Sequence, residues 1–424
     1  MDEQLTSGKL QHVRLGYLCR LQTGLTVDGT RELDGDVVTR PYLRVANVQA
    51  GHLNLDSVSN ITVPRAMAKR SELRSGDVLM TEGGDLDKLG RGTVWRGELD
   101  GCLHQNHVFA LRTNPERLDA RYLAWVTQSG YGRSYFESTG TKTTNLASTN
   151  SSKILDFRIP LPELSEQLRI ADFLDAETAR IDLLLSKRRQ MRDLMALRRE
   201  RITEQVLGLE EGHSTRLVPL KYLARDVSVG IVVTPAKWYV DDGGVPALRG
   251  LNVQPGRILS ESLIRISDKG HAENRKSRLN ADDVVVVRTG QAGAAAVVPR
   301  EFDGANCIDL IIVRLGNKLD PRYVTYVLNS DYAKGQVGLN SVGSIQAHFN
   351  VGAMKQLPIP AASRSEQAAK VAILDREIGS MDALSERLSA QDRLLTERRQ
   401  ALITAAVTGQ LDVTTARPAH DRDF

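Results

Sequence analysis

Paired cysteines and long apolar stretches are scarce in this sequence of 424 residues. Three cysteines cannot form a disulfide framework, so the composition favours a reducing cytoplasm. No apolar stretch approaches the roughly 18 residues that a membrane-spanning helix needs. The polar N-terminus, Met1-Asp2-Glu3-Gln4, is unlike a secretory signal. We therefore expect a cytoplasmic protein with no membrane partner.

The sequence also lacks the motifs of several enzyme classes. No glycine cluster precedes a Lys-Ser or Lys-Thr pair at P-loop spacing, so nucleotide hydrolysis has no support. There is no Pro-Pro pair for the catalytic loop of an amino-methyltransferase, and no nucleophilic triad or carboxylate dyad recurs in matching places. The net charge of +4 is compatible with nucleic-acid binding but does not establish it. These absences predict a chain that performs no catalysis by itself.

An internal repeat at an offset near 200 residues is the most informative feature that the sequence does contain. Ile159-Pro160 followed by Ser165-Glu166-Gln167 recurs as Ile359-Pro360 followed by Ser365-Glu366-Gln367. Further upstream, residues 43–51 match residues 248–256. The period is far longer than the roughly 20–50 residues of a solenoid unit. The chain is therefore predicted to be a duplicated pair of domains.

Each copy divides into a mixed segment followed by a long helix, which predicts an α+β fold with two similar mixed α/β domains. In each domain, short β-rich runs between Gly, Asp and Asn residues predict one twisted, partly antiparallel sheet. The runs are residues 43–48, 77–81 and 107–111 in the first copy and 247–253, 283–288 and 307–313 in the second. Helices are expected at 119–126 and 320–327. The predicted domains are residues 1–161 and 211–360, with long helices at 162–210 and 361–410 and a flexible tail at 411–424.

The long helices carry apolar residues at steps of three, four and seven, which is typical of a coiled-coil seam. Ser363 and Glu366 predict a capping box at the start of the second helix, and Gly208 and Gly409 predict the two ends. The seam residues are Leu174, Ile181, Leu184, Met191 and Ile202 in the first helix and Leu374, Ile378, Met381, Leu388, Leu395 and Ile403 in the second.

Two such helices in one chain can pair with each other or with another copy of the chain. We favour pairing within the chain because the duplication supplies the partner at high effective concentration. A pseudo-twofold axis relating the two copies makes the pair antiparallel. Each helix of about 42 residues would then be roughly 60 Å long.

Cys102, His104 and His107 resemble a metal-binding cluster at first sight. The corresponding segment of the second copy, beginning at Cys307, has no histidine and consists of strand-forming residues. A buried strand with a packed cysteine is therefore favoured over a metal site.

Polar and basic loops occupy corresponding places in the two copies but differ in sequence where the scaffold agrees. Their Lys, Arg, Thr, Gln and Asn side chains are the types that contact phosphates and base edges, although ordinary solvated loops would have a similar composition. Loops that differ on a common scaffold favour two domains that each recognise a different nucleic-acid sequence. The candidate DNA-binding residues are Arg44, Lys88, Arg91, Lys142, Thr143, Thr144, Arg249, Arg288, Gln291, Ser344, Gln346 and His348.

At this point the pattern resembles a known family. Pro162 followed by Glu166-Gln167, the second Ser365-Glu366-Gln367, and the ending at residues 398–409 are similar to those of the specificity subunits of type I restriction-modification enzymes. The resemblance covers about residues 15–413. It implies two target-recognition domains that each read one half of an asymmetric, bipartite site in double-stranded DNA.

The resemblance also implies partners for phage defence. The coiled coil would set the spacer between the half-sites and dock two methyltransferase (modification) subunits, while restriction (helicase-nuclease) subunits cut the DNA. S-adenosylmethionine, ATP and Mg would then be bound by those partners, with no cofactor and no metal in this chain. Two alternatives remain open: a coiled-coil scaffold that never contacts DNA, and a stand-alone nuclease or methyltransferase.

Overall fold

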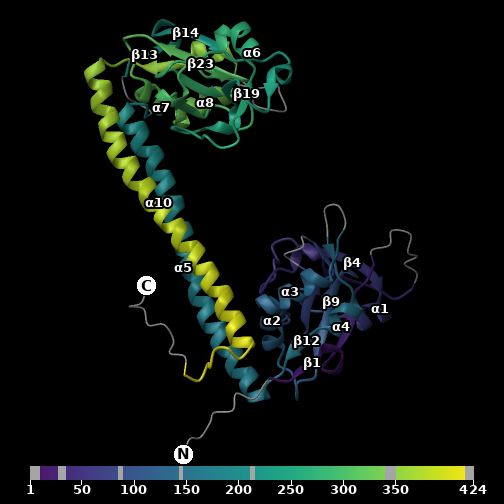
Figure 1. The fold of residues 1–424 in the computed structure, drawn as a ribbon. Helices are drawn as coiled ribbons and strands as arrows, with labels where there is room; N and C mark the ends of the chain where they lie inside the picture. The colour runs from purple at the N-terminus through teal and green to yellow at the C-terminus, as the bar shows by residue number, and fades with distance from the viewer. Residues whose placement is uncertain are drawn as a thin grey trace, which may run out of the picture. The chain divides into compact units, whose positions relative to one another are not determined.

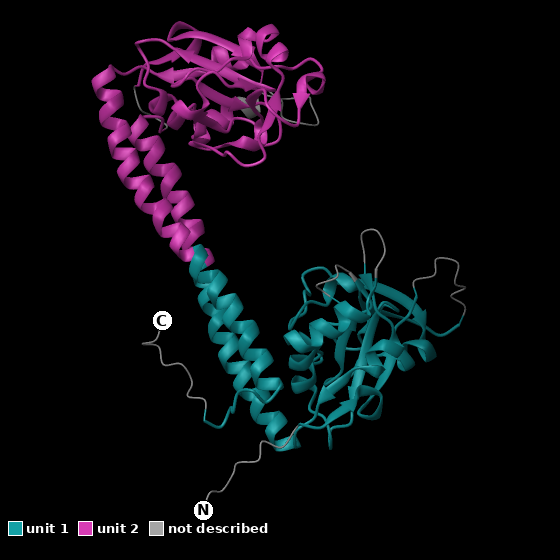
Figure 2. Ribbon diagram, in the orientation of Figure 1, with its two compact units in different colours: residues 1–188, 389–424 teal, residues 189–388 magenta. Residues whose placement is uncertain are grey.

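A computed structural model describes residues 10–26, 35–84, 89–142, 147–210, 215–339 and 350–415. The chain divides into two compact units, residues 1–188 with 389–424 and residues 189–388 (Figure 2). Each unit contains one mixed α/β domain and one portion of each long helix, which confirms the predicted fold class. In the part of the chain that is described, no helix is both long and apolar enough to cross a membrane.

The domain of the first unit contains two main sheets. An antiparallel sheet has the order β2-β9-β5-β7, and a second sheet has the order β4-β3-β8, in which β3 and β8 are parallel. Helix α2 packs on the first sheet through a core that includes Tyr122 and Phe109 (Figure 1). The strands are β2 Cys19–Thr23, β3 Val37–Leu43, β4 Ser59–Pro64, β5 Val78–Thr81, β7 Gly92–Val94, β8 Leu103–His104 and β9 Val108–Thr113. The helices are α1 Arg65–Ser71, α2 Ala120–Gln128, α3 Gly130–Thr139 and α4 Ser151–Asp156.

The domain of the second unit repeats this plan. Its antiparallel sheet β14-β23-β20-β21 corresponds to β2-β9-β5-β7, and helix α7 takes the place of α2. The strands of its two main sheets are β14 Ala224–Val229, β15 Tyr239–Val240, β16 Val245–Leu248, β19 Ile264–Ile266, β20 Val284–Val287, β21 Ala295–Val297, β22 Asn306–Cys307 and β23 Leu310–Leu315. A small hairpin joins β17 Val253–Gln254 to β18 Arg257–Ile258. The helices are α6 Asp268–Glu273, α7 Pro321–Asn329, α8 Asp331–Leu339 and α9 Val351–Gln356.

The prediction of one sheet in each domain is wrong, because two of the expected strands are interrupted. The strand expected at 43–48 ends at Leu43 and gives way to a 3-10 turn at Val45–Asn47. The buried Asn47 amide donates hydrogen bonds to the carbonyl oxygens of Asn54 and Ser57, which fixes the turn. The strand expected at 307–313 is broken at Asp309, whose φ of 52° is left-handed.

The helices that follow each main sheet begin where the sequence predicts. Asp119 caps α2 by accepting a hydrogen bond from the Tyr122 backbone at 2.9 Å. Asp320 caps α7 in the same way through Tyr323, at 3.2 Å. A two-stranded pairing then closes each domain just before its long helix. In the first domain β1 His12–Arg14 pairs with β12 Arg158–Pro160, and in the second β13 Leu217–Pro219 pairs with β24 Pro358–Pro360.

The two long helices, α5 Leu164–Leu207 and α10 Arg364–Val407, have 44 residues each. Ser363 and Glu366 form the predicted capping box, with the Ser363 backbone donating to Glu366 at 2.7 Å. Gly208 and Gly409 follow the last helical turns with φ near +74° and +73°, a conformation that favours glycine.

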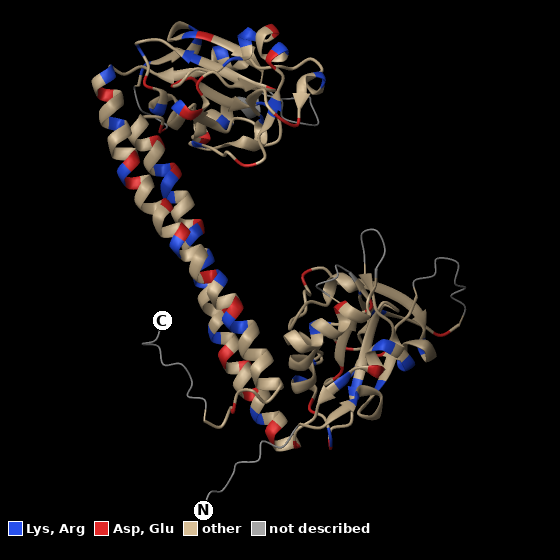
Figure 3. Ribbon diagram, viewed as in Figure 1, with Lys and Arg blue, Asp and Glu red and all other residues tan. Residues whose placement is uncertain are grey.

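Contacts within each unit show that α5 and α10 run antiparallel. In the first unit Arg399 binds Asp182 at 3.0 Å, and Asp392 binds Arg188 at 3.4 Å. Going from 182 to 188 along α5 therefore corresponds to going back from 399 to 392 along α10. In the second unit Arg199 binds Asp382 at 2.6 Å. Figure 3 shows charges of both signs interspersed along both helices. The predicted antiparallel pairing within one chain is confirmed.

Most of the predicted seam residues are covered in the coil. The buried ones are Leu174, Ile181, Leu374, Ile378, Leu388, Leu395 and Ile403, and the half-buried ones are Leu184, Ile202 and Met381.

Met191 is the exception, being 41% exposed, so its assignment to the seam is wrong. The seam instead passes through Arg188 and Arg192, which are partly covered. Because the prediction followed apolar residues alone, it placed the buried face of α5 on the wrong residue at this point. At this point the seam contains the partly buried Arg188–Asp392 ion pair, between the buried Leu388 and Leu395 of α10.

Neighbouring leucines in α10 provide a test of the seam. Leu395 is 8% exposed, whereas Leu394 is 64% exposed. We expect Leu395→Ala to lower the free energy of unfolding by about 2–3 kcal/mol, because it removes buried methyl groups and leaves a cavity. Leu394→Ala should change it by less than about 0.5 kcal/mol. Urea unfolding followed by circular dichroism measures both, and equal losses would contradict this pairing.

Candidate nucleic-acid interface

Strands that adjoin two of the predicted loops of the first domain pair with one another at the end of strand β5. Strand β5 continues past Glu82 into β6 Gly83–Gly84. There β6 pairs with β11 Ala147–Ser148, and β11 pairs with β10 Thr141–Lys142. The segment before residues 85–88 and the two segments that flank residues 143–146 therefore lie in one small sheet, although about 60 residues separate them in the sequence. This strand end is the best candidate for a reading surface in the first domain.

Several candidate residues cannot be placed. Lys88, Thr143, Thr144, Ser344, Gln346 and His348 lie outside the described residues, and only the backbone of Lys142 is described. Their contact with DNA remains a prediction.

Arg44 and Arg249 occupy equivalent positions beside the same edge of each domain. Each precedes a 3-10 turn and donates its backbone N–H to an asparagine side chain, Asn47 at 2.8 Å and Asn252 at 2.9 Å. The Arg44 side chain is exposed, whereas Arg249 is half-buried and donates through Nη2 to the Ser262 carbonyl oxygen. Both side chains lie at this edge, and that of Arg44 is the more exposed to solvent.

Arg288 follows strand β20 at the place that corresponds to Glu82 in the first domain. Its Nη1 donates to Asp309 at 2.6 Å, and the Thr289 hydroxyl lies 3.4 Å from the same carboxylate. Gln291, three residues further on, is exposed. Arg91 in the first domain is half-buried. The structure thus holds Arg288 in a defined orientation at the strand end.

Sequence reasoning missed the contact between Glu82 and His107. Nδ1 of His107 lies 2.5 Å from Oε2 of Glu82, and both side chains are partly exposed at the same strand end. His107 was considered only as a metal ligand. The sequence feature that could have indicated this contact is Glu82 itself, an acidic residue between an apolar strand and the Gly83-Gly84 pair.

Cys102, His104 and His107 are not grouped as metal ligands in the described structure. Nδ1 of the buried His104 lies 2.7 Å from the Val108 carbonyl oxygen, so it carries the proton and donates. Burial lowers the pKa of the His104 imidazole and raises the pKa of the Cys102 thiol to about 12. Within the described ranges, no three His, Cys, Asp or Glu side chains are grouped to hold a metal ion.

The strand register also corrects how this segment aligns with the second copy. His104 is paired with Leu43, and Cys307 is paired with the equivalent Leu248. His104, and not Cys102, is therefore the counterpart of Cys307. Both positions are buried, so a packed side chain occupies each, as the second copy indicated.

The repeated Glu-Gln motif joins each domain to its long helix. In the first unit Oε1 of the buried Gln167 accepts from the Asp119 backbone at 2.9 Å. Its Nε2 donates to the carbonyl oxygens of Arg117 and Pro162, at 3.0 and 2.9 Å. Gln367 makes the same three bonds in the second unit, to the Asp320 backbone and to the Lys318 and Ala362 carbonyl oxygens. One side chain thereby fixes the capping residue of α2 or α7 to the start of the long helix.

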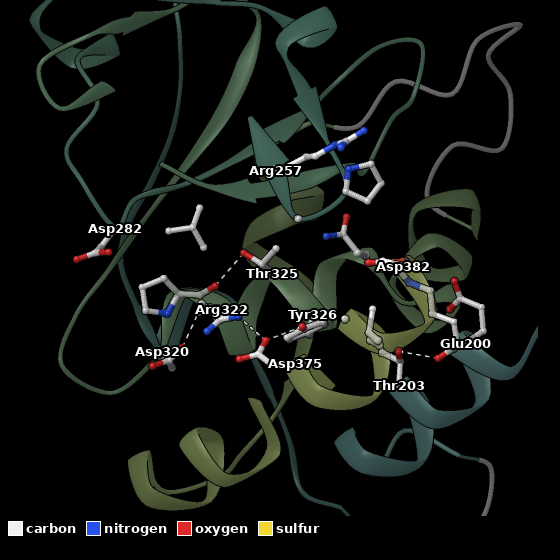
Figure 4. Close-up of a pocket in the computed structure, with 18 of the residues that line it drawn as sticks. Glu200, Thr203, Arg257, Asp282, Asp320, Arg322, Thr325, Tyr326, Asp375 and Asp382 are labelled. Atoms are coloured by element: carbon white, nitrogen blue, oxygen red, sulfur yellow. Dashed lines mark hydrogen bonds and ion pairs between the residues drawn. The ribbon is translucent and has the colours of Figure 1, made fainter. Parts of the chain in front are cut away.

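An aspartate about two turns further along strengthens each junction. Asp175 accepts from the Trp125 indole at 2.8 Å and from Arg121 at 3.1 Å. Asp375 accepts from the Tyr326 hydroxyl at 2.7 Å and also binds Arg322. Figure 4 shows Arg322, Tyr326 and Asp375 directed toward one another in a cleft of about 700 Å³ within the second unit. These carboxylates are engaged in ion pairs, which fits a positioning role.

Replacing the side-chain amide nitrogen of Gln167 with oxygen tests how this residue joins the first domain to α5. Gln167→Glu would replace the Nε2 donor with an oxygen facing two carbonyl oxygens. We expect the free energy of unfolding to fall by about 2–4 kcal/mol, because buried acceptors lose their donor. Gln190→Glu changes an exposed glutamine of the same helix and is the matched control. Thermal unfolding measures both, and similar melting temperatures for the two variants would refute this role.

Comparison with known proteins gives one consistent result. No family model matches the chain. It is 19% identical to the specificity subunit assigned to the type I restriction enzyme MjaX of Methanocaldococcus jannaschii, over 93% of this chain and 92% of the relative. It is 22% identical to the EcoKI type I specificity subunit of Escherichia coli K12, over 88% and 82%.

Solved structures share the fold. A chain from a study of complex assembly and conformational transition in a type I R-M system superposes with a TM-score of 0.73 at 20% identity, covering 95% of this chain and 98% of that one. The HsdS subunit from Thermoanaerobacter tengcongensis gives 0.52 at 19% identity, covering 96% and 99%.

The two repeated domains and the pair of long helices are the architecture that this chain shares with these solved structures. Over nearly its whole length, the chain is a homologue of the specificity subunits of type I restriction enzymes, as the sequence motifs predicted.

Proposed function

We propose that this chain is the DNA-specificity subunit of a type I restriction-modification complex. Each recognition domain reads one half of an asymmetric, bipartite site in double-stranded DNA. The observation that carries this function is the duplication, in which the same domain and the same glutamine junction occur in both units while the strand-end side chains differ. A shared scaffold with unlike reading positions fits two unlike half-sites.

The coil has two roles in this proposal. Its length sets the number of base pairs between the half-sites, and its outer surface docks two methyltransferase subunits. Leucines exposed on the helices, including Leu183, Leu194, Leu197 and Leu394, offer apolar area for these partners. Methylation, ATP-driven translocation and cleavage belong to the partner subunits, which bind S-adenosylmethionine, ATP and Mg. The complex would work in the cytoplasm.

Shortening both helices by one heptad tests the spacer role. Residues 187–193 face residues 388–394, judging from the Asp182–Arg399 and Arg199–Asp382 pairs. Deleting both segments keeps the heptad phase and removes the Arg188–Asp392 pair as a unit. At 1.5 Å per helical residue and 3.4 Å per base pair, we expect a spacer shorter by about three base pairs.

The readout is the DNA motif selected by the complex from randomised sequences. Both half-sites should be unchanged, with only the spacer shortened. Deleting residues 187–193 alone is the control, because it places the two helices out of register and should abolish assembly. An unchanged spacer in the double deletion would exclude the coil as the determinant. A parent complex that selects no motif would exclude sequence-specific DNA recognition altogether.

A further inference from the structure

The strand registers of the two domains identify equivalent positions at the reading edge. In the first domain Thr81 of β5 pairs with Val108 of β9. In the second domain Val287 of β20 pairs with Leu310 of β23. The residue after β5 is Glu82, and the residue after β20 is Arg288. His107 and Asp309 each directly precede the next strand, but the Asp309 backbone donates to Ile231 as the Asn106 backbone donates to Leu25, so the turn of the first domain has one more residue.

At the equivalent strand-end position the first domain has an acidic residue and the second domain a basic one, and each binds a side chain of the facing turn. Glu82 on the strand end binds His107 on the opposite turn, with 2.5 Å between Oε2 and Nδ1. Arg288 on the strand end binds Asp309 on the opposite turn, with 2.6 Å between Nη1 and Oδ1. The strand-end position therefore presents a hydrogen-bond acceptor in one domain and a donor in the other.

The other end of the same sheets has kept its charges. The buried Asp77 binds Arg112 at 2.7 Å in the first domain. Asp283 lies 3.8 Å from Arg314 in the second, at the equivalent positions. The scaffold pairs thus retain their residue types, while the charge at the strand-end position is reversed.

Fold stability does not account for this reversal. The His107, Glu82 and Asp309 side chains are 52%, 30% and 41% exposed, and partly exposed pairs of this kind contribute little to stability, although the Arg288 side chain is only 15% exposed. Each pair lies beside other polar elements of its domain's edge. In the first domain these are the β6-β11-β10 hairpin segments, because the Thr149 backbone donates to the Glu82 carbonyl oxygen at 2.7 Å. In the second domain the neighbour is Thr289.

We propose that this strand-end position reads one base in each half-site, and that the two bases have opposite hydrogen-bonding character. This inference rests on the proposed DNA-specificity function. Arg288 donates to O6 and N7 of a guanine in the major groove, the contact that a guanidinium fork matches. Glu82 accepts from the N4 amino group of a cytosine. His107 and Asp309 are positioning residues that hold the two reading side chains.

Glutamine substitutions test both positions with the same new side chain. Glu82→Gln and Arg288→Gln each remove one charge and present the amide that pairs with adenine N6 and N7. The complex with its partner subunits is assembled with each variant, and the motif is selected from randomised DNA. We expect Glu82→Gln to shift one position of one half-site from cytosine toward adenine. Arg288→Gln should shift one position of the other half-site from guanine toward adenine, each by about 10-fold or more.

Matched controls make the same charge changes away from the reading edge. Glu116→Gln lies beyond the other end of β9, and Arg300→Gln lies beyond the end of β21 that faces the start of β20. Both should leave the motif unchanged. His107→Ala and Asp309→Ala should relax the preference at the same position as their partners, without creating a new preferred base.

The outcomes separate this inference from the proposed function. If the parent selects a bipartite motif and the two glutamine variants select the same motif, base reading at these positions is wrong. A uniform loss of affinity on all sequences, with a smaller salt dependence, would instead assign Arg288 to phosphate contact and also overturn it. A parent complex without any sequence preference would overturn the proposed function itself.

Discussion

Pairing of α5 with α10 inside one chain is the constraint on which the rest of the structure depends. Apolar residues such as Leu174 and Leu374 are buried both by the partner helix and by the domain beside them. The coil is therefore continuous with the two domain cores. Between these ends lies the Arg188–Asp392 pair, and a polar pair inside a seam favours one register over a shifted one. Apolar seam residues stabilise the coil, and the polar pair favours one alignment of the two helices.

Antiparallel pairing gives both domains the same surroundings. The start of α5 packs in the first unit with the end of α10, and the start of α10 packs in the second unit with the end of α5. The duplicated glutamine can therefore perform the same function twice, as Gln167 and Gln367 do. The surroundings are conserved at the junctions and differ at the strand ends, where Glu82 corresponds to Arg288. This separation lets the reading positions change without altering the scaffold.

The sequence predicted the features that depend on local chemistry or on repetition. The helix predicted at 162–210 spans Leu164–Leu207, and the caps at Asp119 and Ser363 are present. Met191 was misassigned because an apolar pattern cannot show that the seam passes through arginines. The division into several sheets was missed because the Asn47 turn depends on acceptors seven and ten residues away.

The candidate site was harder to predict than the fold. The approach of β6, β11 and β10 depends on pairing between distant segments, and no local pattern specifies it. The equivalence of Glu82 with Arg288 needs strand register, because the two residues have opposite charge and no similarity to align. A register error of two residues at Cys102 and Cys307 had the same origin.

A chain with two identical reading domains gives the most direct test of this account. Residues 12–160 would be replaced by residues 217–360, which begin and end at the equivalent strand pairs. The motif selected by the resulting complex is then determined. If antiparallel helices relate the domains by a twofold axis, the motif should be one parent half-site repeated in inverted orientation, with the parent spacer. A direct repeat, or a motif with a single half-site, would contradict it.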